Sequence, residues 1–283
     1  MTLRIASWNI EQRLSRYTKS GRGCPEFIIN SIKQLNADVI FLPEAFDSKI
    51  PIEKTITAKL ASMGYIFYDV PYEEGGPIRP DYPDLSPNLR IMSRIPISKF
   101  KKFRLGKLRN ALSCSVIDPQ TQKEIRILGI HLDDRSEALR QSELPSLIAQ
   151  INSSNLPTVM VGDYNAMSGT TKKAKIINSK FIRLLEKLIL NQEIRSYAIR
   201  ASDMAIGSTL RSLEQNTRLR DVDDKHRPTT TPKLRTVNWL PSIRLIDIDH
   251  MLVSPDILVE NFTIMGYDGG SDHRAISAFI SVK

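Results

Sequence analysis

Six short stretches of the sequence place carboxylates, imidazoles or amides beside strand-like runs. In "PTVMVGDYNA" (157–166), Asp163 and Asn165 follow the run "TVMV" and a glycine. Because residues two apart at a strand end point to the same side, both side chains can act on one group. The carboxylate can take a proton from water while the amide donates to a developing oxyanion. The same residue types also build an ordinary turn, so this stretch alone leaves both interpretations open.

Three more candidate residues follow or interrupt apolar runs. Glu44 ends "DVIFLPEA" (38–45), where free carboxylate oxygens suit a hard cation such as Mg²⁺, although a solvated glutamate is the simpler interpretation. Asn9 lies in "LRIASWNI" (3–10), and asparagine is disfavoured in strands. Its carbonyl oxygen can sit beside a metal, and its amide can hold a phosphate oxygen. His131 also ends an apolar run, where a packed or capping histidine is the alternative.

The stretch "GGSDHRAIS" (269–277) places an acid next to an imidazole at the start of a strand-like run. Adjacent residues point in opposite directions, so Asp272 cannot be the group that orients His273. Asp247 and Asp249, which we expect on one face of an apolar segment, are the natural suppliers of that carboxylate. Buried charges need partners, so at least one of these two acids should bond to something basic. The residues alone do not choose between them.

The elements that must position these residues are short β-like segments, enriched in Ile, Val, Phe and Tyr. They lie at 3–10, 38–45, 65–71, 89–97, 111–119, 123–132, 157–166, 244–254, 260–267 and 274–282. Apolar stripes with helical spacing fall at 25–36, 136–154 and 179–194. Strands and helices alternate early, and strand follows strand late, which predicts a mixed α/β domain with two sheets.

Two features qualify this outline. The second helix should start from a cap at Ser136 and end or kink at Pro145. Residues 200–238 are polar and include an evident loop, "RPTTTPKLR" (227–235). We therefore expect a single domain over 1–283, with a surface excursion at about 200–238.

Composition and charge narrow the classes of partner. The chain has 283 residues, 41% hydrophobic and 25% charged, which is ordinary for a globular protein. It contains no 18-residue apolar run, and its N-terminus lacks the pattern of a signal peptide, so we expect neither a membrane span nor secretion. Two cysteines indicate a reducing cytoplasm. A net charge of +9 favours anionic partners, with solubility alone as the alternative, and no obligate protein partner is evident.

Taken together, the six stretches resemble a known family. In chain order they read "SWNI", "LPEA", "GIHL", "GDYNA", "IDHMLVS" and "SDHRAI", and "IMSRIPI" (91–97) adds a seventh similarity. Their order and spacing resemble the endonuclease/exonuclease/phosphatase superfamily, whose members share the DNase I-like fold. The resemblance runs from residue 3 to residue 282. It implies a four-layer α/β/β/α sandwich, in which two mixed β-sheets pack face to face with helices outside.

The resemblance also implies roles for the candidate residues. Glu44 would bind the divalent metal, Mg²⁺ or in its place Mn²⁺, with Asn9 and Asp272 in or near its shell. Asp163 would align and deprotonate the attacking water, and Asn165 would steady the charge that develops on phosphorus. His131 and His273 would contact phosphate oxygens. Asp249 would hold His273, because it directly precedes "HMLVS", and His250 would be structural.

The substrate remains open between several classes. Abasic-site repair endonucleases of the superfamily carry a tyrosine at the position of His131, so "GIHL" argues against that branch. The leading hypothesis is a Mg²⁺-dependent nuclease acting on DNA or RNA, whose backbone the basic segments 16–23, 98–109 and 170–175 could track. Segment 98–109 is equally well explained as a strand edge guarded by lysines. The alternatives are a phosphatase or phosphodiesterase for a small or lipid-linked phosphate, of the inositol phosphate or sphingomyelin type, and a non-catalytic binding module.

Overall fold

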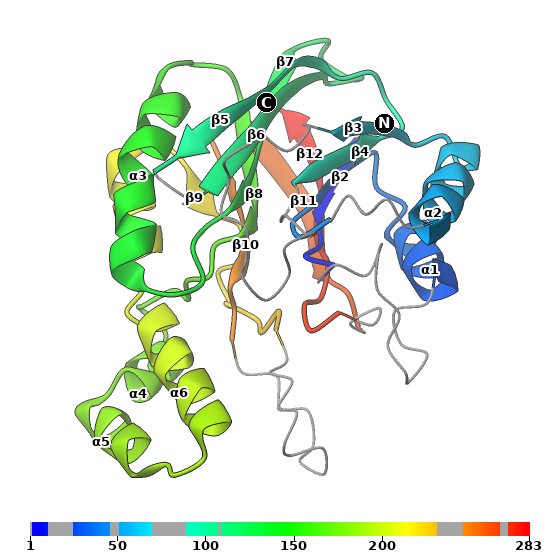
Figure 1. Cartoon of the computed structure of the whole chain (residues 1–283). Coiled ribbons are helices and arrows are strands. Elements are labelled where there is room, and N and C mark those ends of the chain that lie inside the picture. Colours follow the sequence, from blue (N-terminus) through cyan, green and yellow to red (C-terminus); the bar gives the residue numbers. More distant parts are fainter. Residues whose placement is uncertain are drawn as a thin grey trace.

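The computed structural model describes residues 2–10, 25–45, 51–69, 89–106, 109–230, 246–266 and 271–283. In these ranges the strands form two six-stranded sheets (Figure 1). The first sheet has the order β11 (Ile257–Ile264), β12 (Ile276–Val282), β1 (Leu3–Ser7), β2 (Val39–Leu42), β4 (Arg90–Ser93) and β3 (Ile66–Asp69). The second has the order β5 (Ser98–Leu105), β6 (Arg109–Ile117), β7 (Glu124–His131), β8 (Thr158–Asp163), β10 (Asp249–Val253) and β9 (Arg220–Asp221).

The two sheets pack face to face over the main hydrophobic core. Their inner faces supply alternating apolar residues such as Phe41 of β2 and Ile127 of β7, both buried. The sheets approach each other closely at Gly129 of β7, where a Cβ would lie 2.3 Å from the ring of Phe41. A larger residue at 129 would therefore force the sheets apart.

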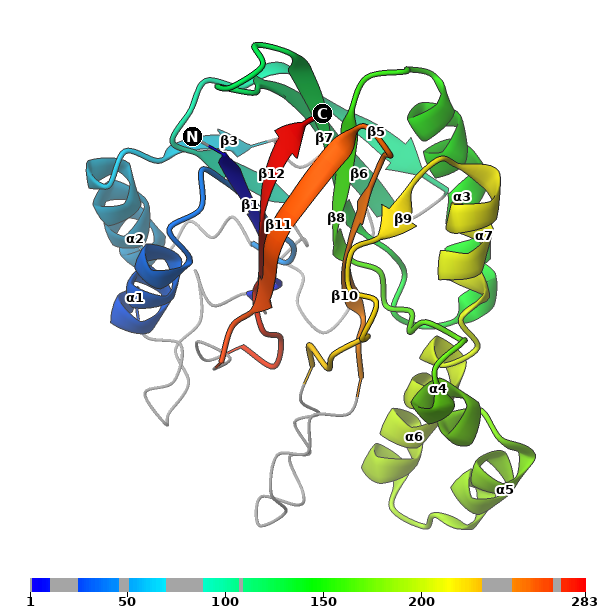
Figure 2. The same cartoon turned by 180° about the vertical axis from the view of Figure 1, so that it is seen from behind.

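Helices cover the outer faces of both sheets (Figure 2). On the first sheet, α1 (Pro25–Leu35) and α2 (Pro51–Ser62) bury one apolar stripe each, represented by Ile32 and Leu60. On the second sheet, α3 (Glu137–Asn152) and α7 (Ser208–Asn216) bury Leu147 and Leu213. The four layers that the resemblance implied are thus confirmed.

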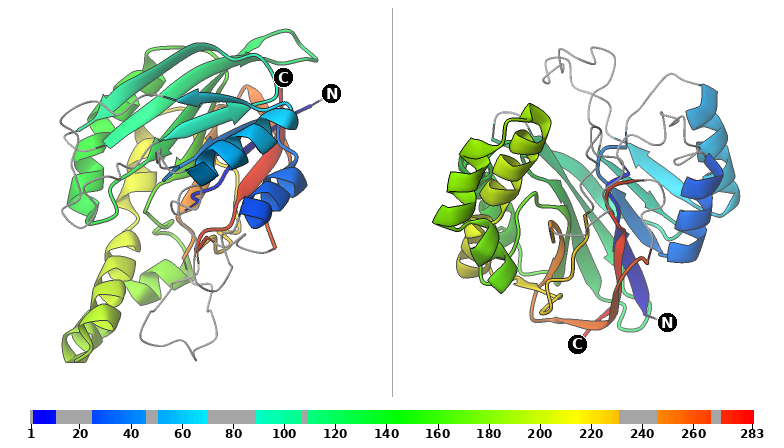
Figure 3. Two further views of the ribbon diagram at one scale, coloured as in Figure 1. Left: turned by 45° about the vertical axis from the view of Figure 1, so that its right-hand side comes forward. Right: turned by 90° about the horizontal axis from the view of Figure 1, so that it is seen from below.

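The strand directions bring the chemistry-bearing residues to one end of the sandwich. β1 runs parallel to β2, and β7 runs parallel to β8, so the carboxyl ends of these strands lie at the same end of their sheets. β10 and β12 run antiparallel to their neighbours and therefore start where those strands finish. The right-hand view of Figure 3, which is seen from below, shows this end of the molecule.

The structure departs from the sequence predictions in two helices. Helix α3 starts from the expected cap, in which the Ser136 hydroxyl accepts from the amide of Leu139, but it continues through Pro145. Of the two expected effects of Pro145, an end or a kink, the end was wrong, because packing on the second sheet supports the helix on both sides of the proline. The stripe at 179–194 is divided between α5 (Lys180–Leu188) and α6 (Gln192–Met204), with Asn191 capping α6.

One helical unit projects from the sandwich. It consists of α4 (Lys172–Ile177), α5 and α6, and Figures 1 and 2 show it extending beyond the end of the sheets where β8 finishes. Of the expected excursion at 200–238, residues 200–230 are described, and they contain the end of α6, helix α7 and strand β9. Among the described residues, each helix is too short or too polar to cross a bilayer.

Candidate active site

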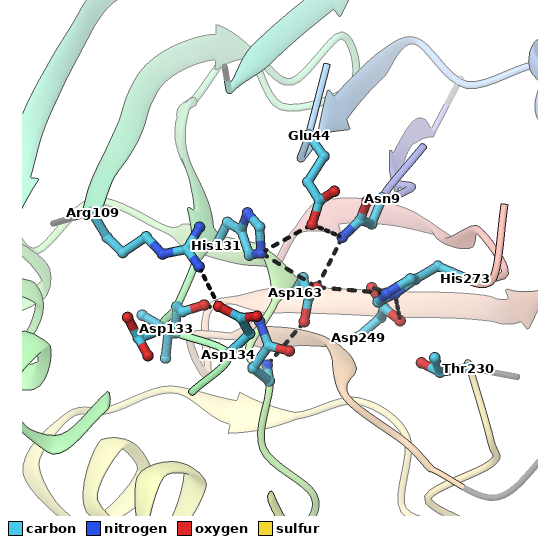
Figure 4. A network of polar contacts seen from close by, with 12 residues as sticks. Asn9, Glu44, Arg109, His131, Asp133, Asp134, Asp163, Thr230, Asp249 and His273 are labelled. Carbon is cyan, nitrogen blue, oxygen red and sulfur yellow. Dashed lines mark hydrogen bonds and ion pairs between the residues drawn. The ribbon is translucent and has the colours of Figure 1, made fainter. Parts of the chain in front are cut away.

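Asp163, the last residue of β8, stands at the centre of the site (Figure 4). It lies opposite His131 in the parallel pairing of β7 with β8 and opposite Asp249 in the antiparallel pairing of β8 with β10. Gly162 has φ 152°, and a Cβ there would lie 2.0 Å from the carbonyl oxygen of Ile130. Glycine is therefore required where the strand delivers Asp163.

The first sheet contributes Asn9 and Glu44 from the ends of β1 and β2. The amide of Ile10 donates to the carbonyl of Pro43, so pairing between the two segments continues past the strands. Nδ2 of Asn9 donates to Oδ2 of Asp163 at 3.0 Å and to Oε1 of Glu44 at 3.4 Å. Glu44 has φ 54°, a left-handed conformation that ends β2 abruptly. Asn9 thereby links the carboxylates of the two sheets.

His273 is held between the sheets by its backbone and by its ring. Its amide donates to Ser271, whose hydroxyl donates to the carbonyl of Asn9, and its own carbonyl accepts from Nε1 of Trp8. Nδ1 of the ring lies 2.8 Å from Oδ2 of Asp249. The two glycines before Ser271, at 269 and 270, lie outside the described residues.

The remaining imidazole approaches the same carboxylates from the other side. Nε2 of His131 lies 3.6 Å from Oδ2 of Asp163 and 3.8 Å from Oε1 of Glu44, and its side chain is 3% exposed. Nε2 of His273 lies 3.8 Å from the same Asp163 oxygen. Asp163 therefore faces two imidazoles, one from each sheet.

Asn165 lies in the turn that follows Asp163. Its amide N–H donates to Oδ1 of Asp163 at 2.9 Å, and its Nδ2 donates to the carbonyl of Leu132 at the end of β7. The residue has φ 49°, as expected for an asparagine that closes a tight turn around an aspartate. Asn165 thus fixes the carboxylate of Asp163 and ties β8 to β7.

The structure separates the two acids of the "IDIDH" stretch. β10 begins at Asp249, so Asp247 precedes the strand and the expectation that both lie on one face was wrong. The Asp247 carboxylate lies 3.9 Å from Nδ1 of His226, whereas Asp249 bonds His273. The amide of Asp249 donates to Oγ1 of Thr229, which anchors the start of the strand.

Burial and neighbouring charges set the protonation of these groups. Burial raises the pKa of Asp163 to about 7, against the opposing charge of His273. Burial alone would lower the pKa of His273, but Asp249 and then Asp163 outweigh it and hold that pKa well above its usual value. Burial, reinforced by the charge of Asp272, raises the pKa of Glu44. The site therefore joins a cationic imidazole to several carboxylates that repel each other.

The donor set of Glu44, Asn9 and Asp272 fits a divalent cation. Glu44 and Asp272 keep 21% and 26% of their side chains exposed, and the charge of Asp272 disfavours ionisation of Glu44. Carboxylate and amide oxygens are the ligands that Mg²⁺ takes in proteins. Atoms of Asp163, Asp249 and His273 also come within 4.8 Å of one another, close enough for a metal. Because Nδ1 of His273 is already bonded to Asp249, this second group is better explained as a hydrogen-bonded His–Asp pair beside Asp163 than as a metal site.

Sequence reasoning did not single out Arg109, at the start of β6. Its guanidinium lies 2.8 Å from Asp134 with 11% of the side chain exposed, and its charge opposes the rise in the pKa of Glu44 that burial and Asp272 cause. Arg109 belongs to the basic segment 98–109. Along the same segment, Lys99 bonds Glu124 and Lys101 bonds Gln150, so these lysines guard the outer edge strand β5. Basic character marked the segment, but only the fold distinguishes Arg109 within it.

The family follows from comparison of the whole sequence. The sequence model of the Endonuclease/Exonuclease/phosphatase family matches residues 6–273, which include all eight candidate residues. The chain belongs to this family. It is accordingly a phosphoric ester hydrolase, and the suspected resemblance is confirmed. A comparison with curated proteins found no match.

Solved structures of other family members share the fold at low sequence identity. The human Nocturnin catalytic domain with bound sulfate anion is 16% identical with a TM-score of 0.62, over 100% of this chain and 95% of that one. TDP2 of D. rerio, complexed with single-strand DNA product, is 17% identical with a TM-score of 0.61, over 99% of both chains. The Bacteroides thetaiotaomicron mannosyl-6-phosphatase is 17% identical with a TM-score of 0.59, over 99% and 100%.

Proposed function

We propose that this Endonuclease/Exonuclease/phosphatase family member is a Mg²⁺-dependent phosphodiesterase that hydrolyses DNA or RNA by attack of water. The observation that supports this proposal best is the position of Asp163. Its Oδ2 accepts from Asn9 and lies 3.6 Å and 3.8 Å from the imidazoles of His131 and His273. A phosphoryl group bound next to Asp163 would thus contact a general base, Asp163, and two hydrogen-bond donors, His131 and His273.

In this mechanism Asp163 aligns the attacking water and takes its proton. A pKa near 7 suits a general base at neutral pH. The amide of Asn165 bonds Oδ1 of Asp163 and Nδ2 of Asn9 bonds Oδ2, so the carboxylate is held from both sides, and Oδ2, which faces the two imidazoles, has a second lone pair for the proton of water. Nδ2 of Asn165 gives one N–H to the carbonyl of Leu132, and its second N–H would steady the phosphorane-like charge.

His273 and His131 act on the phosphate oxygens. His273 is held cationic by Asp249, so it offers Nε2–H to a phosphoryl oxygen or to the leaving oxygen. His131 approaches from β7 and makes the second contact. Together they neutralise charge that otherwise slows attack on an anionic ester.

The proposed cation would be held by Glu44, with Asn9 and Asp272 beside it. When bound, Mg²⁺, or Mn²⁺ in its place, supplies charge neutralisation at the phosphoryl oxygens. Glu44 and Asp272 provide the negative charge that draws the cation in, and Asn9 holds Glu44 in line with Asp163. We propose that the residues from 1 to 283 act as one domain in this reaction.

Nucleic acid is the preferred substrate on the grounds of charge. The chain carries 40 Lys and Arg against 31 Asp and Glu, and a polyanion gains affinity from each phosphate that is neutralised. Arg109, which lies on the rim of the site, can contact a phosphate that flanks the scissile one. With two cysteines in the chain, we propose the cytoplasm as its location.

A second candidate is a phosphoester carried by a lipid or a small molecule. It is favoured by the helical unit α4–α6, which exposes Phe181, Leu184 and Leu188 beyond the same end of the sheets as the site. Apolar side chains of this kind do not contribute to phosphate recognition, so they indicate a surface that contacts apolar groups. One of the solved structures with this fold is named a mannosyl-6-phosphatase, and that name describes an activity on a small phosphate ester.

A substrate panel distinguishes these candidates. Purified protein is incubated with single- and double-stranded DNA, RNA, inositol phosphates and sphingomyelin vesicles, each with Mg²⁺ and with EDTA. We expect cleavage of nucleic acid with Mg²⁺, no cleavage with EDTA, and loss of cleavage in Asp163→Asn and His273→Ala. Asp247→Asn is the matched control, since this buried acid lies two residues before Asp249 but outside the site. Release of phosphate from the inositol or lipid substrates alone would replace the nuclease with the second candidate.

A further inference from the structure

Helix α5 exposes its apolar residues and buries an acidic one. Four of its five large apolar residues, Phe181, Leu184, Leu185 and Leu188, follow the spacing of one helix face, and they are 66%, 57%, 39% and 68% exposed. The only residue of α5 that is buried is Glu186, whose carboxylate accepts from the hydroxyl of Ser202 in α6. Soluble helices place their apolar stripe against the protein. This one presents it to the outside.

Two further apolar residues of the unit are exposed. Ile176 near the end of α4 is 63% exposed, and Leu190 in the connection to α6 is 96% exposed. Isolated exposed leucines are common, but several exposed apolar residues within one projecting unit indicate an interaction surface. We call the set of Ile176, Phe181, Leu184, Leu185, Leu188 and Leu190 the apolar face of α4–α6.

The unit that carries this apolar face is strongly basic. Residues 172–204 contain eight Lys or Arg and three Asp or Glu, so they hold a net charge of +5 out of +9 for the chain. Two of the three acids are engaged internally: Glu186 with Ser202, and Asp203 with Arg140. Lys180, Arg183 and Lys187 lie exposed on α5 itself. The partner that covers this face must therefore be apolar in part and anionic.

The unit lies at the functional end of the molecule. Figures 1 and 2 show α4–α6 extending past the end of the sheets where β8 finishes and β10 begins, and these strand ends carry Asp163 and Asp249. A surface that contacts α5 would therefore lie at the same end of the molecule as Asp163 and Asp249.

We infer that α4–α6 docks the enzyme on the surface of an anionic lipid bilayer. Leu and Phe side chains enter the boundary between headgroups and acyl chains, while the lysines and arginines around them meet anionic headgroups. A second copy of the chain is disfavoured because two units of +5 repel each other. Nucleic acid is disfavoured because aliphatic side chains do not stack on bases. The inference concerns where the enzyme sits, and if the second candidate holds, it brings the site to lipid-borne phosphoesters.

The test is sedimentation of the full chain with vesicles. Vesicles of phosphatidylcholine alone are compared with vesicles that contain about one third phosphatidylserine, at low and at physiological salt. We expect binding to the anionic vesicles, weakened by salt. Leu184→Ser together with Leu188→Ser should lower the partition coefficient about tenfold for each leucine replaced. Lys180→Glu together with Lys187→Glu should abolish the preference for phosphatidylserine.

A matched control is Leu258→Ser on β11, which is 45% exposed but far along the chain from the helical unit. It should bind vesicles as the wild type does. The inference fails if wild type does not sediment with anionic vesicles or if the double leucine variant sediments equally well. It also fails if light scattering shows a dimer that the leucine changes dissociate, or if those changes weaken binding to DNA and leave vesicle binding intact.

The outcome can be separated from the proposed catalytic function. Hydrolysis of a soluble diester such as bis(p-nitrophenyl) phosphate, measured without vesicles, should be unchanged in the leucine variant, which lies outside the site. Conversely, Asp163→Asn should still sediment with vesicles. A protein that binds vesicles but cleaves no ester would keep the docking inference and remove the proposed function.

Discussion

Asp249 and Asp163 stand on either side of the His273 ring. Nδ1 lies 2.8 Å from Oδ2 of Asp249, and Nε2 lies 3.8 Å from Oδ2 of Asp163. The two acids face each other directly in the antiparallel register of β10 with β8. Their separation is therefore set by strand pairing. The imidazole comes from the other sheet, so the geometry of the site depends on how the two sheets pack.

The first prediction concerns Asp249→Asn. The amide can still bond Nδ1, but it no longer stabilises an imidazolium, so His273 becomes a poorer donor to phosphate. We expect kcat/KM to fall about 10²- to 10⁴-fold, as loss of the acid does in other His–Asp pairs. Steady-state kinetics on a soluble diester, with circular dichroism to check the fold, make the measurement.

Asp247→Asn is the control for this change. Asp247 is 2% exposed, and within the described part of the chain neither of its carboxylate oxygens has a hydrogen bond. An amide there removes a poorly solvated charge, so activity should stay at the wild-type level and thermal stability should not fall. Equal losses of activity in both variants would mean that the His273–Asp249 pair has no special role.

The second prediction concerns metal binding at Glu44. Without a cation, burial and the charge of Asp272 raise the pKa of Glu44, so the ionised site is strained. Mg²⁺ should relieve this repulsion and stabilise the wild-type fold by about 2.7 kcal/mol at a hundredfold excess over its Kd. Glu44→Gln should lose this stabilisation and should melt no lower than wild type in EDTA. An equal Mg²⁺-dependent rise in Tm for both proteins would place the cation elsewhere.

Short stretches of sequence were enough to predict the residues that come together. Asn9 and Glu44 follow strands β1 and β2, His131 and Asp163 are the last residues of β7 and β8, and parallel pairing of β1 with β2 and of β7 with β8 brings such ends to one place. Glycine, asparagine and aspartate at these ends are visible in a single sequence because tight turns need them. The roles of these residues remain predictions, but their proximity follows from local patterns.

Features that depend on packing could not be predicted. The apolar stripe at 179–194 indicates helical structure, which is divided between α5 and α6, yet periodicity does not say which face meets the protein, and α5 exposes its part of the stripe. Arg109 is one of several basic residues in 98–109, and only the register of β6 in the sheet brings it to the site. Asp247 and Asp249 look equivalent in sequence, and the first residue of β10 separates them.

The third prediction concerns Arg109→Gln. Arg109 is bonded to Asp134 at the rim rather than to Asp163, so it is placed to hold substrate and not to take part in proton transfer. We expect KM for a polynucleotide to rise about tenfold, with kcat nearly unchanged, since its contact with phosphate is similar in the ground and transition states. Lys101→Gln, on the edge strand β5, is the control and should change neither constant. A fall in kcat alone would assign Arg109 to the chemical step.

The fourth prediction concerns His250, which is buried behind the site. Nδ1 lies 2.7 Å from Oδ2 of Asp221, and Nε2 lies 2.9 Å from the carbonyl of Ala166. Both partners are acceptors, so both ring nitrogens must carry a proton and the ring is an imidazolium. Burial alone would lower the pKa of His250, but the charge of Asp221 outweighs it and raises that pKa to about 9. Asp247 and Tyr164 are the other titratable groups beside the ring.

A pKa that is higher in the folded chain than in the unfolded one makes stability depend on pH. The contribution of His250 is fully present below the ordinary value of 6.5 and is lost as the pH rises through about 9. The difference amounts to about 3 kcal/mol in the free energy of unfolding. His250→Gln should therefore be less stable than wild type near pH 6, and the gap should narrow towards about pH 10, as measured by urea unfolding at each pH. Groups that titrate in both proteins, such as Asp163, cancel in this difference. A gap that stays constant over the range would show that the ring is neutral when folded.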